Sequence, residues 1–241
     1  GLVAHVVLSF AVWYLAVFGC LVQISSNKEG SLLDKAGLGL ATAGTLLLMI
    51  PSLLDRGEPT LNNYIPVIID PLYYSGLALL ALGVLASILS SIRYTVSGPD
   101  LKAPIYLYVM AILAFILAEM QLGNQPLNHD YNERLFWGGG HLLQFLNVAL
   151  LLIAWSYLAD LIKTNLPYKV ASLWLIAASL LGLAFYSLWD VMDEKQTQAF
   201  TDLQYALGPA VLIFALALFP TLGRQFKNFK WQDPAMLSLW S

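Results

Sequence analysis

The sequence predicts an all-α, polytopic membrane protein with about seven transmembrane helices in one bundle. Of its 241 residues, 59% are hydrophobic and only 11% are charged, and the mean hydropathy is +0.69. A water-soluble domain of this size does not need so many apolar residues to fill one core. Long apolar runs also recur along the whole chain, without a soluble domain or a repeat array between them. We therefore interpret residues 1–241 as a single transmembrane helical domain, a segment or shortened relative of a longer subunit.

Seven apolar stretches are long enough to span a bilayer, whose hydrocarbon core takes about 20 helical residues. The predicted spans are residues 2–23, 36–54, 65–92, 103–122, 136–161, 168–189 and 203–222. The third stretch is overlong, so we expect an interfacial turn at Asp70–Pro71, and we expect Pro209 and Pro220 to bend the last. Segments 55–64 and 124–134 contain Gly, Pro, Asn and charged residues, as loops outside the membrane do.

Basic residues predict the orientation, because cytoplasmic loops retain Lys and Arg. The side on which the first helix begins has only Arg56, Arg134 and Lys195. The opposite side has the other nine basic residues, which are Lys28, Lys35, Arg93, Lys102, Lys163, Lys169, Arg224, Lys227 and Lys230. The lysine-rich side is therefore predicted to be cytoplasmic and the other side to be outer, which is periplasmic for a bacterial inner membrane.

Composition also bears on partners. The net charge of −3 argues against nucleic acid, and the apolar helices imply contact with a lipid bilayer. A single cysteine, Cys20, excludes an intrachain disulfide framework. From Gly1 onward the sequence is as apolar as a membrane span, and it has no signal-peptide pattern. We therefore expect the amino-terminal end to be missing or processed.

All three histidines fall on the predicted outer side, together with Glu119. His5 is near the outer end of the first helix, His129 is in the loop before the fifth, and His141 is inside the fifth. An ionisable residue within a membrane span is a functional-site hypothesis by default. A buried neutral imidazole can bind haem iron or a transition metal when its other ring nitrogen is held. Gln144 lies on nearly the same helix face as His141 and is a candidate for that partner.

Simpler interpretations of these residues stay open. A histidine within a span can hydrogen-bond to a neighbouring helix without binding metal, and glycines 138–140 can serve only to let two helices approach closely. His129 is also interpreted as an ordinary loop residue. A metal site without haem is a further hypothesis, built from His5, Glu119, His129 and His141, whose donor types suit zinc or copper.

The run from Asn132 to Asn147, with its core Trp137-Gly138-Gly139-Gly140-His141, resembles the sixth helix of subunit I of the haem-copper oxidase superfamily. The cbb3-type and nitric-oxide-reductase-like branches are the most similar. This resemblance implies that His141 is a ligand of the second metal, either copper or non-haem iron. The opening run from Ala4 to Phe10 similarly looks like the family's second helix, which implies that His5 is an axial ligand of a low-spin haem b.

Two further segments extend the resemblance to family helices two to eight. Residues Tyr168 to Trp174 look like the start of the family's seventh helix, and residues 230–237 resemble the Asp-Pro segment before its ninth. The chain departs from the pattern at Tyr186 and Ser187, which stand where the family has a His-His pair.

The resemblance implies haem-binding electron transfer toward reduction of O2 or NO, with an incomplete binuclear site in this chain. It also implies a cytochrome c-type or quinol electron donor and other membrane subunits. Oxidoreductase activity is expected only if the metal site is completed elsewhere. The competing hypothesis is a haem-free helical bundle with a structural, sensing or transport role. Transport is disfavoured because spans 36–54 and 203–222 carry no charge near their centres.

Overall fold

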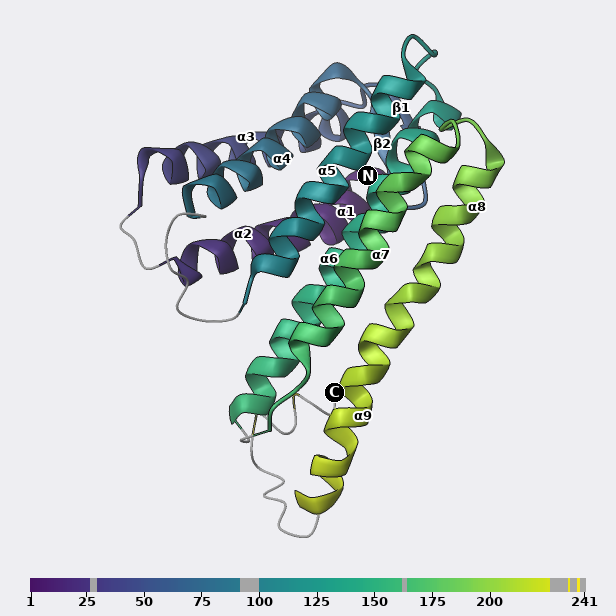
Figure 1. Ribbon diagram of the computed structural model, residues 1–241. Coiled ribbons are helices and arrows are strands. Elements are labelled where there is room, and N and C mark those ends of the chain that lie inside the picture. The colour runs from purple at the N-terminus through teal and green to yellow at the C-terminus, as the bar shows by residue number, and fades with distance from the viewer. Residues whose placement is uncertain (27–29, 92–99, 162–163, 226–233, 235–237, 239–241) are drawn as a thin grey trace. The chain divides into compact units, whose positions relative to one another are not determined.

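The computed structural model describes residues 1–26, 30–91, 100–161, 164–225, 234 and 238, and these are almost entirely helical (Figure 1). The helices are α1 (Leu2–Val7), a π-helical segment (Leu8–Val12), α2 (Trp13–Ser25), α3 (Leu32–Leu53), α4 (Pro71–Ser91), α5 (Lys102–Leu122), α6 (His129–Leu161), α7 (Tyr168–Leu188), α8 (Glu194–Leu203), a 3-10 turn (Gln204–Ala206) and α9 (Leu207–Gln225). Two short strands, β1 (Glu58–Thr60) and β2 (Val67–Ile69), lie between α3 and α4.

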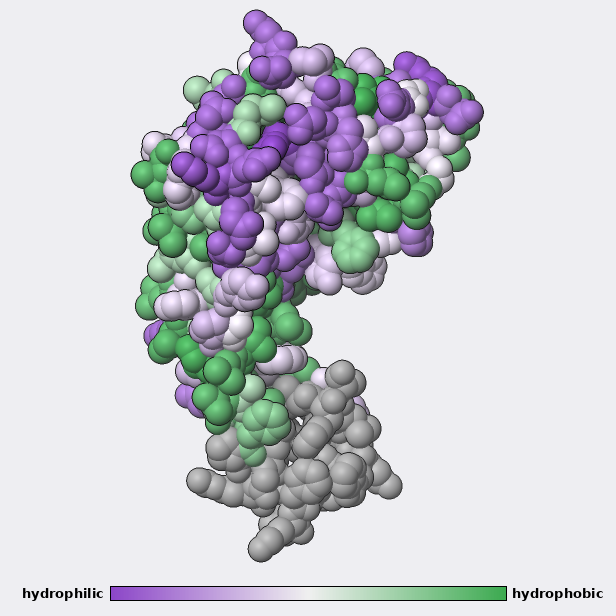
Figure 2. Space-filling model, turned by 90° about the vertical axis from the view of Figure 1, so that its right-hand side faces the viewer, coloured by the Kyte–Doolittle hydropathy of each residue, from purple (hydrophilic) through white to green (hydrophobic). Residues whose placement is uncertain are grey.

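Among the described residues, seven helical stretches are long and apolar enough to cross a membrane, which confirms the predicted class. They are Leu2–Ser25, Leu32–Leu53, Pro71–Ser91, Lys102–Leu122, His129–Leu161, Tyr168–Leu188 and Glu194–Phe219. Many large hydrophobic side chains on them are exposed, including Leu46, Leu113, Leu173 and Leu216. Figure 2 shows broad hydrophobic areas on the visible surface. The protein is therefore an integral membrane protein whose helices contact lipid.

Backbone contacts group the chain into two compact units. The first comprises residues 1–98 and 115–140, and the second comprises residues 99–114 and 141–241. Helices α5 and α6 each contribute one stretch to each unit. The two units are described separately below.

A small antiparallel hairpin precedes α4, where the sequence analysis expected helix from residue 65. Strand β1 pairs with β2 in the register Glu58↔Ile69 and Thr60↔Val67. The predicted turn at Asp70–Pro71 is confirmed, since α4 begins at Pro71 and the Asp70 carboxylate accepts a hydrogen bond from the Leu72 amide at 2.8 Å. Asp70 also forms an ion pair with Arg56 at 3.0 Å. Residues 65–69 were assigned to a helix because a short apolar run has no periodicity that separates strand from helix.

Two polar segments outside the predicted spans are helical in the structure. Helix α6 starts at His129 instead of residue 136, because the Asn128 side chain accepts a hydrogen bond from the Tyr131 amide at 2.9 Å and caps the helix. His129 is therefore an exposed helical residue and not a loop residue. Helix α8 was also missed, although Asp193 caps it by accepting from the Lys195 amide at 2.8 Å. Both segments are polar, and a criterion based on hydropathy assigns such residues to loops.

Helices α3 and α4 pack backbone against backbone in the first unit. Gly37 and Gly44 on α3 face Gly83 and Gly76 on α4, so glycines seven residues apart on each helix match in antiparallel order. A Cβ atom at Gly44 would lie 2.6 Å from the Leu80 nitrogen and 2.7 Å from the Gly76 carbonyl oxygen. Small residues permit this close approach of the two main chains. Helices in lipid have no hydrophobic driving force for association, so close packing of this kind stabilises the pair instead.

We expect Gly44→Ala to destabilise the protein, because the new methyl group meets main-chain atoms that cannot rotate away. Overpacking of this kind costs about 1–3 kcal/mol, and the melting temperature in detergent should fall by about 2–4 °C for each kcal/mol. Gly39→Ala is the matched control, since nothing lies within 4 Å of a Cβ atom at Gly39. An equal melting temperature for both variants would contradict the backbone contact.

Candidate functional site

His5 lies on the exposed face of α1. Val3 and Val7, four residues apart, are buried with 4% and 1% of their surface accessible, and His5 is about 200° around the helix from Val3. Its carbonyl oxygen accepts a hydrogen bond from the Ser9 hydroxyl at 2.8 Å, at the start of the π-helical segment. The imidazole therefore points away from the interior of the first unit. A π-helical turn inside a helix is uncommon and is often found near functional sites.

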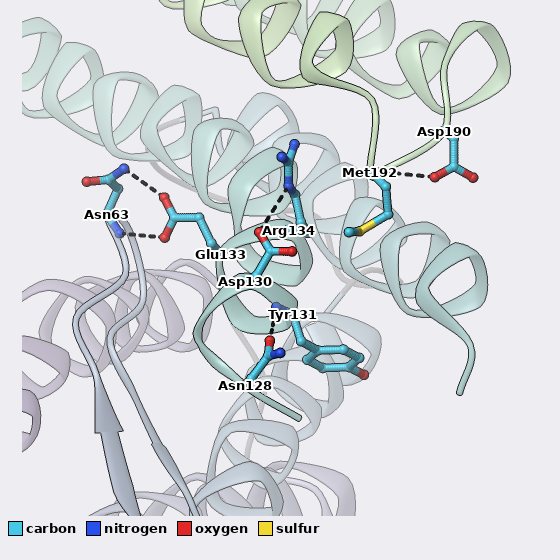
Figure 3. A network of polar contacts seen from close by, with 8 residues as sticks. All are labelled: Asn63, Asn128, Asp130, Tyr131, Glu133, Arg134, Asp190 and Met192. Carbon is cyan, nitrogen blue, oxygen red and sulfur yellow. Dashed lines mark hydrogen bonds and ion pairs between the residues drawn. The ribbon is translucent and has the colours of Figure 1, made fainter. Parts of the chain in front are cut away.

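The first two turns of α6 are bound to the hairpin by a group of polar side chains that we call the hairpin cluster: Thr60, Asn63, Tyr74, Asn132 and Glu133. Asn63 donates to the Glu133 carboxylate from its main-chain nitrogen at 3.3 Å and from its side-chain amide at 2.7 Å (Figure 3). Asn132 is fully buried, accepts from the Tyr74 hydroxyl at 2.9 Å and donates to the Thr60 hydroxyl at 3.3 Å. These bonds fix the position of α6 against β1 and α4.

Glu119, a predicted site residue, lies at the edge of this region. Its exposed carboxylate accepts a short hydrogen bond from the Tyr131 hydroxyl, which comes from the first turns of α6. Nearby in sequence, Arg134 and Asp130 form an ion pair at 3.6 Å, also drawn in Figure 3. Glu119 therefore links α5 to α6 in the described structure.

The glycine run before His141 accommodates aromatic rings. A Cβ atom at Gly139 would lie 2.2 Å from the Phe115 ring on α5, and one at Gly140 would lie 2.4 Å from the Tyr64 Cβ atom. Tyr64 also meets Trp137 edge to face, with ring centroids 5.6 Å apart. Burial, together with the nearby Glu133 carboxylate, raises the pKa of Tyr64 to about 12, so this hydroxyl stays protonated at neutral pH. The glycines thus hold Tyr64 and Phe115 against the turn of α6 that leads to His141.

His141, a predicted site residue, is buried with 1% of its surface exposed, and it lies in the second unit. Its ring centroid is 5.8 Å from that of Phe200 on α8, and the Phe200 ring is also 5.6 Å from Tyr186 and 5.2 Å from Phe185 on α7. The Gln204 side chain donates to the His141 carbonyl oxygen at 3.4 Å. Histidine, aromatic rings and an amide are therefore gathered between α6, α7 and α8.

Several buried polar atoms in the second unit lack hydrogen-bond partners among the described residues. They include the Gln204 Oε1 atom, the Ser179 hydroxyl oxygen and the Thr164 hydroxyl oxygen. Ser179 lies on the same face of α7 as Gly182, and Gly182 faces Phe200 and Leu142. A buried polar atom without a partner is costly in a membrane, so such atoms commonly mark the approach of a further polar group.

As a possible metal ligand, each histidine of the described structure would act as a single donor. In the described part of the chain, no three His, Cys, Asp or Glu side chains come together to hold a metal. Gln144 is half-buried on α6, three residues after His141. Of the consecutive residues Tyr186 and Ser187 on α7, Tyr186 is buried and Ser187 is exposed, so only Tyr186 faces the interior.

Phe200 and Gln204 were not identified from the sequence. Phe200 lies between the predicted spans 168–189 and 203–222, and Gln204 lies at the start of the second of these. The spacing of three residues could have revealed helix α8. Gln196, Phe200 and Leu203 are buried at intervals of four and three residues. That spacing is typical of one face of an amphipathic helix.

Comparisons with known proteins find relatives without an assigned function. An uncharacterized protein of Aquifex aeolicus is 31% identical over 144 residues, which is 56% of this chain and 36% of the relative. An uncharacterized protein of Rickettsia prowazekii is 26% identical over 258 aligned residues, which is 90% of this chain and 50% of the relative. The chain thus spans half the length or less of these two relatives. No family model matches, and no solved structure matches.

We expect Gly140→Ala to displace Tyr64 from α6, because the clash involves the rigid Cβ atom of Tyr64 and not the end of a flexible side chain. The loss should be about 1–3 kcal/mol, as for other overpacked sites. Near-ultraviolet circular dichroism reports the aromatic contact and thermal unfolding reports the stability. Gly208→Ala, at a helical glycine with open space around it, should leave both measurements unchanged. Unaltered dichroism in Gly140→Ala would contradict the contact.

Proposed function

We propose that the chain belongs to a membrane-embedded, respiratory-type subunit that binds haem and transfers electrons toward reduction of O2 or NO. The observation that carries this proposal is the buried His141, with 1% of its surface exposed inside a candidate membrane span. Histidine is rare at such positions, because a polar group buried away from water is costly unless it has a partner.

The surroundings of His141 suit a neutral imidazole that ligates a metal. Phe200 packs on the ring, and its aromatic contacts exclude water from that side. Gln204, which already bonds to the His141 carbonyl, has a buried oxygen that lacks a partner among the described residues. We assign His141 to copper or non-haem iron, with Gln144 and Tyr186 as its neighbours.

His5 is the proposed axial ligand of haem b. Its exposed imidazole has a free path to a group lying against the outward face of α1. The π-helical segment that follows α1 has more residues per turn than an α-helix. Residues after it therefore point in other directions around the helix axis than an unbroken α-helix would give them. A haem at this position would contact α1 from outside the first unit, so His5 is a single donor that another segment or subunit must complement.

Haem iron would supply a one-electron couple, and burial, axial ligation and hydrogen bonding in the protein would set its potential. The expected electron donor is a cytochrome c-type protein or a quinol, and other membrane subunits are expected partners. Because Tyr186 faces inward where the family has histidine, catalytic reduction would require ligands beyond those described in this chain. We further propose a bacterial inner-membrane location, with His5 and His141 toward the periplasmic side.

A second candidate function is a haem-free helical bundle with a structural, sensing or transport role. Two observations favour it: the His141 ring packs on Phe200, and the described residues contain no three-ligand group. In this case His141 is a packing residue, and the buried oxygen of Gln204 would be satisfied by a further helix.

Absorbance spectroscopy separates the two candidates. We expect the detergent-purified protein, expressed with haem available, to show sharp absorbance bands after reduction with dithionite. His5→Ala should abolish the low-spin haem bands, because iron loses an axial ligand. His141→Ala should retain those bands and lose bound metal, measured by elemental analysis.

His129→Ala is the control, since His129 is exposed at the first residue of α6. It should keep both the haem bands and the metal content. A featureless spectrum from folded wild-type protein would reject the haem proposal and leave the helical bundle.

A further inference from the structure

A groove in the first unit runs between α2, α3 and α4 and has a volume of about 500 Å³. Its walls are mostly apolar and include Leu15, Ala16 and Gly19. One end is polar, where Gln23, Asp34 and Lys35 line the opening. None of these residues belongs to the proposed haem or metal sites.

The length of the groove matches one leaflet of a bilayer. Along α2 it is lined from Val12 to Ile24, and along α3 from Asp34 to Thr45. Twelve helical steps of 1.5 Å correspond to about 18 Å, whereas half of the hydrocarbon core is about 15 Å. The groove therefore reaches from the polar end of these spans to about the middle of the membrane. A complete transmembrane helix of another protein would need a groove about twice as long.

Among the described residues, Asp34 and Lys35 are the charged side chains that line the polar end. Ser31 caps α3, and Asp34 completes the capping box by accepting from the Ser31 amide at 2.6 Å. The Asp34 carboxylate also accepts from the Ser31 hydroxyl at 2.8 Å, from Gln23 at 2.9 Å and from Ser90. These hydrogen bonds come from Ser31, Gln23 and Ser90. Lys35, the next residue, is exposed at the mouth of the groove.

An ammonium group beside an amphipathic groove of one-leaflet depth complements a phospholipid. The phosphate would meet Lys35 at the membrane surface, where a lysine contributes to the binding of anionic lipid. The acyl chain would lie along the apolar wall formed by Leu15, Ala16 and Gly19. We infer that this groove binds an anionic membrane phospholipid, with one acyl chain in the groove and the phosphate at Lys35.

Cys20 provides a probe, because this exposed thiol lines the groove. Delipidated protein in a neutral detergent is titrated with phosphatidylglycerol, and alkylation of Cys20 by N-ethylmaleimide is followed by mass spectrometry. Bound lipid should cover the thiol, so its alkylation rate should fall about tenfold at a lipid concentration about ten times the Kd. Lys35→Gln should raise the Kd about fivefold, the effect of losing one lysine near anionic lipid, so protection at the same lipid concentration should fall to about threefold.

Two pairs of variants separate the groove from general effects on the membrane protein. Gly19→Leu places a side chain in open space within the groove and should abolish protection, whereas Gly39→Leu, also at an open helical position but outside the lining, should not. Lys169→Gln removes an exposed lysine from the other unit and should keep full protection.

Three results would overturn the inference. The first is an alkylation rate independent of phosphatidylglycerol. The second is equal protection in wild type, Gly19→Leu and Lys35→Gln, which would indicate nonspecific shielding by lipid. The third is protection by a short-chain quinone at concentrations where phosphatidylglycerol has none, which would identify a different ligand.

Discussion

Backbone amides and carbonyls in hydrocarbon have no water with which to bond, so each must find its partner within the protein. This constraint accounts for the seven apolar helices and for the placement of the only two strands among the described residues, β1 and β2, in the polar connection before α4. It also explains why Asp70, Asn128 and Asp193 cap helices at the ends of apolar segments. The capping residues satisfy amides that the helices themselves leave open.

Since lipid provides no hydrophobic drive between helices, the first unit relies on close approach and on polar bonds. The four facing glycines of α3 and α4 bring main chains together, while the hairpin cluster ties α6 to β1 and α4. Glycine has a different use at Gly139 and Gly140, where the missing side chains admit the ring of Phe115 and the Cβ atom of Tyr64. The same residue type thus serves backbone contact in one place and aromatic packing in another.

The surroundings of Asp34 and of His141 differ. Asp34 accepts hydrogen bonds from Ser31, Gln23 and Ser90 and completes the capping box of α3. Around His141, by contrast, Gln204 presents a buried oxygen that no described residue satisfies. This contrast is the physical reason for placing the proposed metal chemistry at His141 and the proposed lipid contact beside Asp34.

Composition and apolar run length were sufficient to predict the membrane class, the seven spans and the turn at Asp70–Pro71, because crossing a bilayer imposes length and hydropathy on each span separately. They also singled out His141, since a histidine within such a span is rare. Sequence alone did not identify the hairpin, the early start of α6 or helix α8, because short or polar elements depend on caps and partners distant in the chain. Only the tertiary structure decided that His141 is buried while His5 is exposed, and that Phe200 and Gln204 adjoin His141. The helices packed around a side chain decide whether it faces the interior or the outside. Hydropathy along one helix does not identify those neighbouring helices.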